Sequence, residues 1–264
     1  MLDLRQYPSL GAALRDALDH WPNETCLIEA DRDREKTRLT YSDFKELARP
    51  LTRALQDADY REGDRGAIIM TNQSKWLVSA YAIFFCGGVL VPLDYKLTAE
   101  EHLQLLAHSK AKFLIVEYYL WRAIMQSPEF KNHGVKTVLV TEAPLRADLG
   151  GAYRWEDFHR KGDPIFIDRQ RDDVACIVYS SGTGAVPRDA CSLTRIISSS
   201  ARRSPRGIRS GRACVTSAFC PPTTPSILWW GSSGRLCAAL AWCTCGRCVL
   251  SMCAMHSSAI ASPT

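Results

Sequence analysis

The sequence changes character near Asp189, and this change limits a regular fold to the first part of the chain. All 28 Asp and Glu residues lie within residues 1–189. Residues 190–264 contain eight Arg and eight of the 11 Cys, but no Asp, Glu, Lys, Asn, Gln or Tyr. A segment that offers its arginines no acidic partners and shows no consistent apolar period has little capacity for a unique packed state. We therefore expect a folded domain over residues 1–188 and an Arg-, Cys- and Ser-rich tail without a fold over residues 189–264.

Residues 1–189 alternate between short β-rich runs and helical patterns, which is typical of an α/β fold with a parallel sheet flanked by helices. The expected strands cover residues 26–30, 38–41, 65–70, 89–93, 113–117, 135–140 and 174–179. The expected helices cover residues 10–21, 44–58 and 74–85, and a fourth begins at the capping-box sequence of Thr98 and Glu101. The charged segment DRDREKT predicts a turn between the first two strands.

The stretch YSSGTGAVPR, residues 179–188, follows the last expected strand and has the residue types of a phosphate-binding loop. Gly182 and Gly184 allow backbone angles that turn several N–H groups to one side, and hydroxyl side chains add further donors. The hydroxyl residues are Ser180, Ser181 and Thr183, and Arg188 supplies a cation. An ordinary turn uses the same residue types, so from this stretch alone both interpretations stand. The P-loop pattern G-x-x-x-x-G-K-[ST] is absent here.

Three stretches together resemble the adenylate-forming superfamily of acyl- and aryl-CoA synthetases, peptide-synthetase adenylation domains and luciferases. LTYSDF, residues 39–44, is similar to its L-[ST]-Y-x-E-L opening, and FFCGGVLVPLD, residues 84–94, is similar to L-K-A-G-x-A-Y-V-P-[IL]-D. YSSGTGAVPR is similar to Y-[ST]-S-G-[ST]-T-G-x-P-K. The three occur in the family's order, and residues 1–188 look most like a bacterial long-chain acyl-CoA synthetase. The first two stretches contain no reactive group, so we interpret them as parts of the sheet and its helix packing.

The resemblance implies ATP-dependent activation of a carboxylic acid, with a fatty acid as the expected substrate class. In this family the acid attacks the α-phosphate of ATP, pyrophosphate leaves, and the acyl group then passes to the thiol of coenzyme A or an acyl carrier. The loop holds the β- and γ-phosphates with Mg²⁺ by positioning and electrostatic stabilisation. By position, the ATP-binding residues are Ser180, Ser181, Gly182, Thr183, Gly184 and Arg188. Arg188 stands where the family has Lys, and Ala185 stands where Gly is usual, which changes the reach of the cation and stiffens the loop.

The resemblance ends at this loop. The family continues with G-[CV]-x-[LH]-T-H-x-N, whereas this chain continues with DACSLTRIISS. One nucleotide string encodes both DACSLTRIISS and, from its third base, RMLAHANNFF, and the same offset over residues 219–236 permits a second family-like segment. Our hypothesis is that a base was lost near the codons for Arg188 and Asp189, so that residues 190–264 are an out-of-frame translation. The family's adenine motif, ribose-binding Asp, hinge and catalytic Lys would then be missing, and we expect a truncated, inactive remnant with no catalytic residue.

The alternative is a non-catalytic protein that binds a nucleotide through the loop or a polyanion through the tail. A basic stretch is formed by Arg202, Arg203, Arg206, Arg209 and Arg212. It has no interleaved aromatic side chain, which argues against nucleic acid as a partner. Cys243, Cys245 and Cys248 lack the paired spacing of a zinc site, and the six His residues form no constellation, so no metal site is expected.

The chain is expected in the cytoplasm without a membrane span. No run of 18 apolar residues occurs, and the start MLDLRQYPSL lacks the basic and apolar regions of a signal peptide. Cys26, Cys86 and Cys176 sit singly in apolar segments, as reduced core cysteines do. His102 and His108 are expected on a surface helix, in solvated or core roles rather than as ligands.

Overall fold

A computed structural model describes residues 6–31, 34–132, 134–180 and 188–193, together with the short segments 227–228, 237–238 and 252–253. The helices are α1 (Leu10–His20), α2 (Tyr41–Asp57), α3 (Ser74–Phe85), α4 (Ala99–Ser109), α5 (Tyr118–Gln126) and the 3₁₀ helix η2 (Phe130–Asn132). The strands are β1 (Thr25–Asp31), β2 (Arg34–Thr40), β3 (Arg65–Ile69), β4 (Val89–Pro92), β5 (Phe113–Glu117), β6 (Thr137–Thr141), β7 (Tyr153–Arg154), β8 (Val174–Ser180), β9 (Arg188–Leu193), β10 (Ile227–Leu228), β11 (Cys237–Ala238) and β12 (Met252–Cys253). None of the described helices is long and apolar enough to cross a membrane.

The main sheet has seven strands in the order β7-β6-β5-β3-β4-β8-β9. All neighbouring pairs from β7 to β8 are parallel, and only β9 runs antiparallel to its neighbour β8. Helices α3, α4 and α5 connect successive parallel strands of this sheet. The expected α/β class with a parallel sheet flanked by helices is therefore confirmed.

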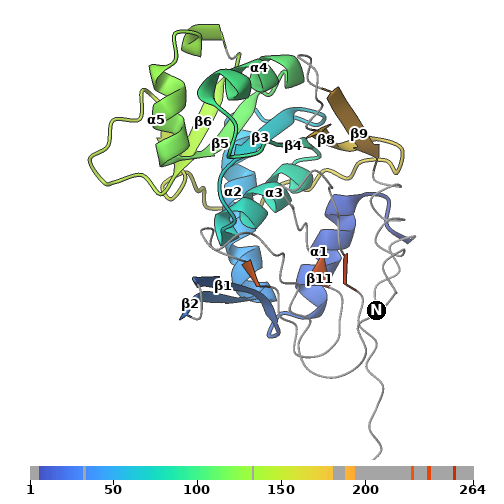
Figure 1. Cartoon of the computed structure of the whole chain (residues 1–264). Coiled ribbons are helices and arrows are strands. Elements are labelled where there is room, and N and C mark those ends of the chain that lie inside the picture. The colour runs from blue at the N-terminus through green and yellow to red at the C-terminus, as the bar shows by residue number, and fades with distance from the viewer. Residues whose placement is uncertain are drawn as a thin grey trace, which may run out of the picture.

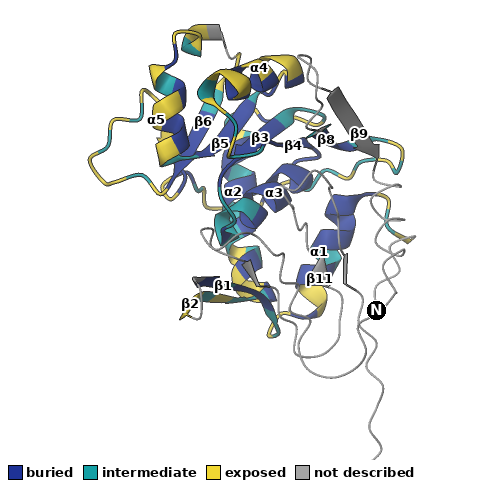
Figure 2. Ribbon diagram, viewed as in Figure 1, coloured by how far each residue is buried: buried dark blue, intermediate teal, exposed yellow. Residues whose placement is uncertain are grey.

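Helices cover both faces of the sheet, so its central strands β3, β4 and β5 are buried on both sides (Figures 1 and 2). On one face, α1, α2 and α3 pack on side chains such as Ile68, Ile115 and Leu139. On the other face, α4 and α5 pack on the alternate residues of the same strands, for example Ile69 and Val116. This alternation explains why the strands read as continuous apolar runs in the sequence.

Two helices begin with a capping box, and the one at Thr98 was expected from the sequence. Thr40 caps α2 in a capping box: its hydroxyl accepts from the Asp43 backbone N–H at 3.1 Å, and the Asp43 carboxylate accepts from the Thr40 backbone N–H at 2.9 Å. Thr98 and Glu101 form the same arrangement at the start of α4. The sequence LTYSDF is therefore the junction where β2 ends and α2 begins.

The FFCGG segment ends α3 in a Schellman motif, which requires glycine at one position. Gly87 has the left-handed φ of +67° and donates its N–H to the Phe84 carbonyl at 3.0 Å. Gly88 donates to the Ile83 carbonyl at 2.9 Å, and β4 follows at once. This second family-like stretch thus shapes the chain between a buried helix and a buried strand.

Several boundaries differ from those expected. Most of DRDREKT belongs to strands rather than to a turn, because β1 extends to Asp31 and β2 begins at Arg34. α5 and β7 were not predicted. β9 crosses the boundary expected at residue 188, since its backbone pairs with β8 as far as Leu193. The expectation of a tail without a fold falls mostly outside the described residues and stays a prediction.

Candidate functional site

The carboxyl ends of the parallel strands β3, β4, β5, β6 and β8 meet at one edge of the sheet. Behind β3 the chain turns to α3 on one face, whereas behind β4 and β5 it turns to α4 and α5 on the other face. The connections that follow the neighbouring strands β5 and β3 therefore lead in opposite directions along the sheet and over opposite faces. In open α/β sheets, ligands bind in the crevice at such a switch point.

The predicted phosphate loop leaves this edge at the end of β8. Ser180 and Arg188 are backbone partners across the antiparallel pair of β8 and β9, as are Tyr179 and Asp189. Residues 181–187 therefore connect two strand ends that lie next to each other, as a hairpin loop does. Ser181, Gly182, Thr183 and Gly184 lie outside the described residues, as do the side chains of Ser180 and Arg188. Their role in binding ATP stays a prediction.

The strand in front of the loop is held against α4 by an aromatic contact. The Tyr179 hydroxyl lies 2.9 Å from Nδ1 of His108, and the two rings meet edge to face with centroids 5.7 Å apart. His108 is on the exposed side of the last turn of α4. This contact orients Tyr179, the last described side chain before the loop, and it links β8 to α4.

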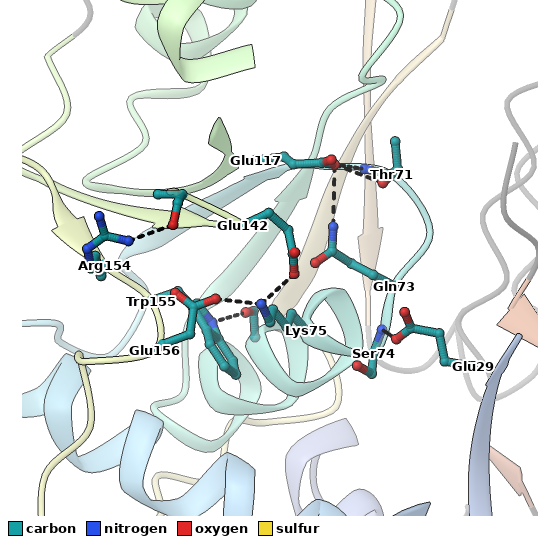
Figure 3. Close-up of polar contacts among 12 residues, drawn as sticks. Glu29, Thr71, Gln73, Ser74, Lys75, Glu117, Glu142, Arg154, Trp155 and Glu156 are labelled. Carbon is teal, nitrogen blue, oxygen red and sulfur yellow. Dashed lines mark hydrogen bonds and ion pairs between the residues drawn. The ribbon is translucent and has the colours of Figure 1, made fainter. Parts of the chain in front are cut away.

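A carboxylate links the carboxyl ends of β5 and β3 (Figure 3). Glu117, the last residue of β5, accepts at Oε2 from the Thr71 backbone N–H at 3.0 Å and from the Thr71 hydroxyl at 2.8 Å. The Gln73 amide nitrogen lies 3.4 Å from the same oxygen. Because Thr71 and Gln73 follow β3, this cluster ties the carboxyl ends of two neighbouring strands together.

A second polar cluster ties the start of α3 to the segment after β6 (Figure 3). The Lys75 ammonium contacts Glu142 and Glu156 at 2.5 Å each, and it lies over the Trp155 ring. Burial lowers the pKa of Lys75, but the two carboxylates outweigh this effect and hold the pKa above its usual value. For Glu156, burial raises the pKa, but the hydrogen bond and charge of Lys75 together with backbone hydrogen bonds outweigh this effect and hold the pKa below its usual value. Lys75 and Glu156 therefore both stay charged across the neutral pH range.

The histidines and cysteines form no site in the described part of the chain. His102 is buried rather than on a solvated surface, because α4 turns this residue inward, and its Nε2 lies 2.8 Å from the Asp94 carbonyl oxygen. Cys26, Cys86 and Cys176 are buried thiols that form no disulfide. Among the described residues, no group of three or more His, Cys, Asp or Glu is placed to hold a metal ion.

Neither polar cluster belongs to a motif that the sequence analysis above describes. A Glu that ends an apolar strand and a Thr-x-Gln sequence just after another strand are the signals that point to Glu117, Thr71 and Gln73. Lys75, by contrast, meets Glu142 and Glu156 across sequence separations of 67 and 81 residues. No pattern in one sequence indicates such a pairing.

The sequence matches the AMP-binding enzyme family over residues 14–206. It is 27% identical over 184 residues to a 3-[(3aS,4S,7aS)-7a-methyl-1,5-dioxo-octahydro-1H-inden-4-yl]propanoyl:CoA ligase of Rhodococcus jostii, covering 65% of this chain and 35% of that protein. It is 25% identical over 159 residues to a long-chain-fatty-acid CoA ligase of Mus musculus, covering 57% of this chain and 24% of that protein. The chain thus spans about a third or less of the length of these relatives.

The fold is similar to solved structures of such ligases. It superposes with a TM-score of 0.61 and 22% identity on the anthranilate CoA ligase AuaEII, which was solved in complex with anthranoyl-AMP. The superposition covers 72% of this chain and 35% of the ligase. At this level of identity the similarity concerns the fold.

Proposed function

The chain belongs to the AMP-binding enzyme family, and from this premise we propose that it carries the ATP-binding loop of an acid–thiol ligase. In the proposed reaction a carboxylate attacks the α-phosphate of ATP, pyrophosphate leaves, and an acyl-adenylate forms. The thiol of coenzyme A or an acyl carrier then displaces AMP and yields the thioester. A fatty acid is the proposed substrate class, supported by the similarity to a long-chain-fatty-acid CoA ligase.

The observation that carries the proposal is the position of the loop. Ser180 and Arg188 are paired in the backbone at the carboxyl edge of the sheet, so residues 181–187 start and end at one point of that edge. In our proposal Gly182 and Gly184 let the loop's N–H groups converge on the β- and γ-phosphates. The hydroxyls of Ser180, Ser181 and Thr183 add donors, and Arg188 offsets phosphate charge.

Mg²⁺ enters this proposal as the partner of the ATP phosphates, where it would neutralise negative charge as pyrophosphate leaves. The chain's own contribution is positioning and electrostatic stabilisation of the phosphates. Arg188 in place of Lys can donate two parallel hydrogen bonds to one phosphate group, whereas Lys acts as a point charge. We therefore propose that Arg188 is the residue whose loss most weakens nucleotide binding.

We further propose that this 264-residue chain does not complete adenylation by itself. The support is its coverage of about a third of the length of the Rhodococcus ligase. The cytoplasm is the proposed location, which agrees with the buried, reduced thiols of Cys26, Cys86 and Cys176.

Two measurements on the full chain test these proposals separately. Titration with Mg–ATP by calorimetry reports binding, and we expect Arg188→Ala to weaken it about tenfold, as loss of a charge-assisted hydrogen bond does. Arg146→Ala is the matched control, because Arg146 is exposed in the loop after β6, and it should leave binding unchanged. Equal loss in both variants, or no binding by the unmodified chain, would contradict the loop assignment. ATP–pyrophosphate exchange with a panel of fatty acids should give no signal, and clear exchange would contradict the proposed inactivity.

The proposed origin of the tail has its own test. Sequencing the gene through the Arg188 codon should reveal a shifted frame that continues the family, and an intact frame with the same ending in related genes would refute the frameshift. A chain that ends at Leu193 keeps β9. If it lost salt-sensitive binding to DNA or anionic lipid that the full chain shows, the alternative of a polyanion-binding tail would gain support.

A further inference from the structure

Glu117 carries a charge that no cation in the described part of the chain balances. Its three donors are the neutral groups of Thr71 and Gln73, and all three meet Oε2. Described ion pairs at this edge of the sheet use Glu142 and Glu156, which share Lys75. A carboxylate at a partly buried position is stabilised best by an opposite charge, and Oε1 remains available for one.

Two buried polar atoms next to Glu117 lack hydrogen-bond partners among the described residues. Gln73 is 8% exposed and its Oε1 is unpaired, and Thr141 is fully buried with an unpaired Oγ1. Figure 3 shows the Gln73 amide with its nitrogen toward Glu117 and its oxygen turned to the side on which Glu142 lies. Buried polar atoms of this kind call for a bound water or ion, because an unpaired one costs about 1–3 kcal/mol.

The sheet register brings these oxygens to one place. Glu117 and Thr141 are backbone partners in the parallel pair of β5 and β6, so their side chains project from the same face. That face is the one covered by α3, since Ile115 and Leu139, two residues earlier in each strand, belong to the core beneath α3. Gln73 is the residue immediately before α3. A carboxylate, an amide oxygen and a hydroxyl from three elements therefore border one spot at the carboxyl edge.

We propose that this spot binds a monovalent alkali cation, held by Glu117, the Gln73 carbonyl oxygen and the Thr141 hydroxyl. Hard cations prefer such oxygen ligands. Glu117 would be the one charged ligand among the three, and a single carboxylate with two neutral oxygens suits a monovalent ion better than a divalent one. The described residues also contain no cluster of three or more His, Cys, Asp or Glu, such as a divalent ion would use. The cation would join the ends of β5 and β6 to the start of α3.

Thermal unfolding of the full chain in different salts tests this proposal. Sodium or potassium chloride is compared with choline chloride at the same ionic strength, since choline is too large for the spot. Binding to the folded state alone raises Tm, by about 3–6 °C when the ion exceeds its Kd tenfold. The rise should saturate with ion concentration. Equal Tm values in all three salts would overturn the proposal.

Three variants localise the effect, and one serves as the control. Glu117→Gln removes the charge, Gln73→Met removes the amide oxygen, and Thr141→Val removes the hydroxyl at nearly constant volume, so each should abolish the salt-specific rise. Glu62→Gln makes the same carboxylate-to-amide change at the surface, where Glu62 pairs with Arg169, and should keep the rise. Rubidium in a crystal should give an anomalous peak beside Glu117. A peak-free map with an ordered water at this spot, or variants that keep the full rise, would refute the site.

Discussion

Gly87 offers a sharp test of why the FFCGG segment ends α3 as it does. Its φ of +67° is the left-handed conformation, which costs an alanine about 1–2 kcal/mol. A Cβ built on Gly87 would lie 2.7 Å from Cγ2 and 3.0 Å from Cβ of Ile167. Gly87→Ala therefore adds crowding, at about 1–3 kcal/mol, to the cost of the backbone conformation.

Ile167 has little room to retreat from that new methyl group. Its backbone N–H donates to the Phe85 carbonyl at 3.0 Å, and the Gln56 side chain holds both the N–H and the carbonyl of Ile165. We expect Gly87→Ala to lower the free energy of unfolding by about 3 kcal/mol, which corresponds to roughly 6–12 °C in Tm for a domain of this size. The measurement is urea or thermal unfolding followed by helical circular dichroism.

Two comparisons separate the parts of this effect. Gly151 has φ +87° and nothing within 4 Å of a built Cβ, so Gly151→Ala should cost only the backbone part, about 1–2 kcal/mol. Adding Ile167→Ala to Gly87→Ala should cost less than the sum of the two single changes, because the branched side chain that crowds the methyl group is gone. The reasoning fails if Gly87→Ala is no worse than Gly151→Ala, or if the double variant is strictly additive.

Two further predictions concern a helix start and a buried ring. Thr40→Ala removes the cap of α2 and half of its capping box, so the free energy of unfolding should fall by about 1 kcal/mol, whereas Thr40→Ser should keep most of it; a change below 0.3 kcal/mol would contradict the role of the cap. Burial lowers the pKa of His102 below its ordinary 6.5, so the unfolded chain takes up this proton first as the pH falls. The contribution of neutral His102 to the free energy of unfolding should thus be fully present above about pH 6.5. Below that pH the free energy of unfolding should decline with a slope of up to about 1.4 kcal/mol per pH unit for one proton. His102→Gln keeps a donor for the Asp94 carbonyl but does not titrate, and the slope measured by urea unfolding should become shallower; an unchanged slope would show that His102 does not carry it.

The parallel sheet could be predicted from the sequence because its signals are local. Apolar runs such as those of β3 and β5 are buried on both faces, and α3 has the expected bounds of Ser74–Phe85. The strands expected for the β1 and β2 hairpin are too short, because the charged residues of DRDREKT predict a turn. In the structure β2 has a mostly exposed surface, which tolerates Arg34, Glu35 and Lys36 in a strand.

The candidate site was harder to predict because its parts come from distant segments. The loop was found from its glycines and hydroxyls, but the antiparallel partner β9 depends on backbone pairing, which side-chain patterns barely indicate. Glu117 ends a strand whose pattern is apolar, and only the strand order β6-β5-β3 reveals that it lies between Thr141 and Gln73. That order arises because the connection from β4 to β5 through α4 crosses over β3. Such a crossover depends on tertiary packing rather than on a local pattern.

The strand order also predicts that the two proposed sites act independently. The cation would lie at the end of β5, and the loop leaves the end of β8, with β3 and β4 between them. Three strand spacings amount to about 14 Å, which exceeds the Debye length of about 8 Å at physiological salt. In unscreened water, a unit charge and the roughly two net negative charges of Mg–ATP would interact by about 0.6 kcal/mol at this distance, and screening over nearly two Debye lengths reduces this several-fold. Because this coupling changes the affinity for ATP by less than a factor of two, ATP titrations in choline chloride and in potassium chloride should give the same Kd. An experiment that refutes one proposed site therefore does not refute the other.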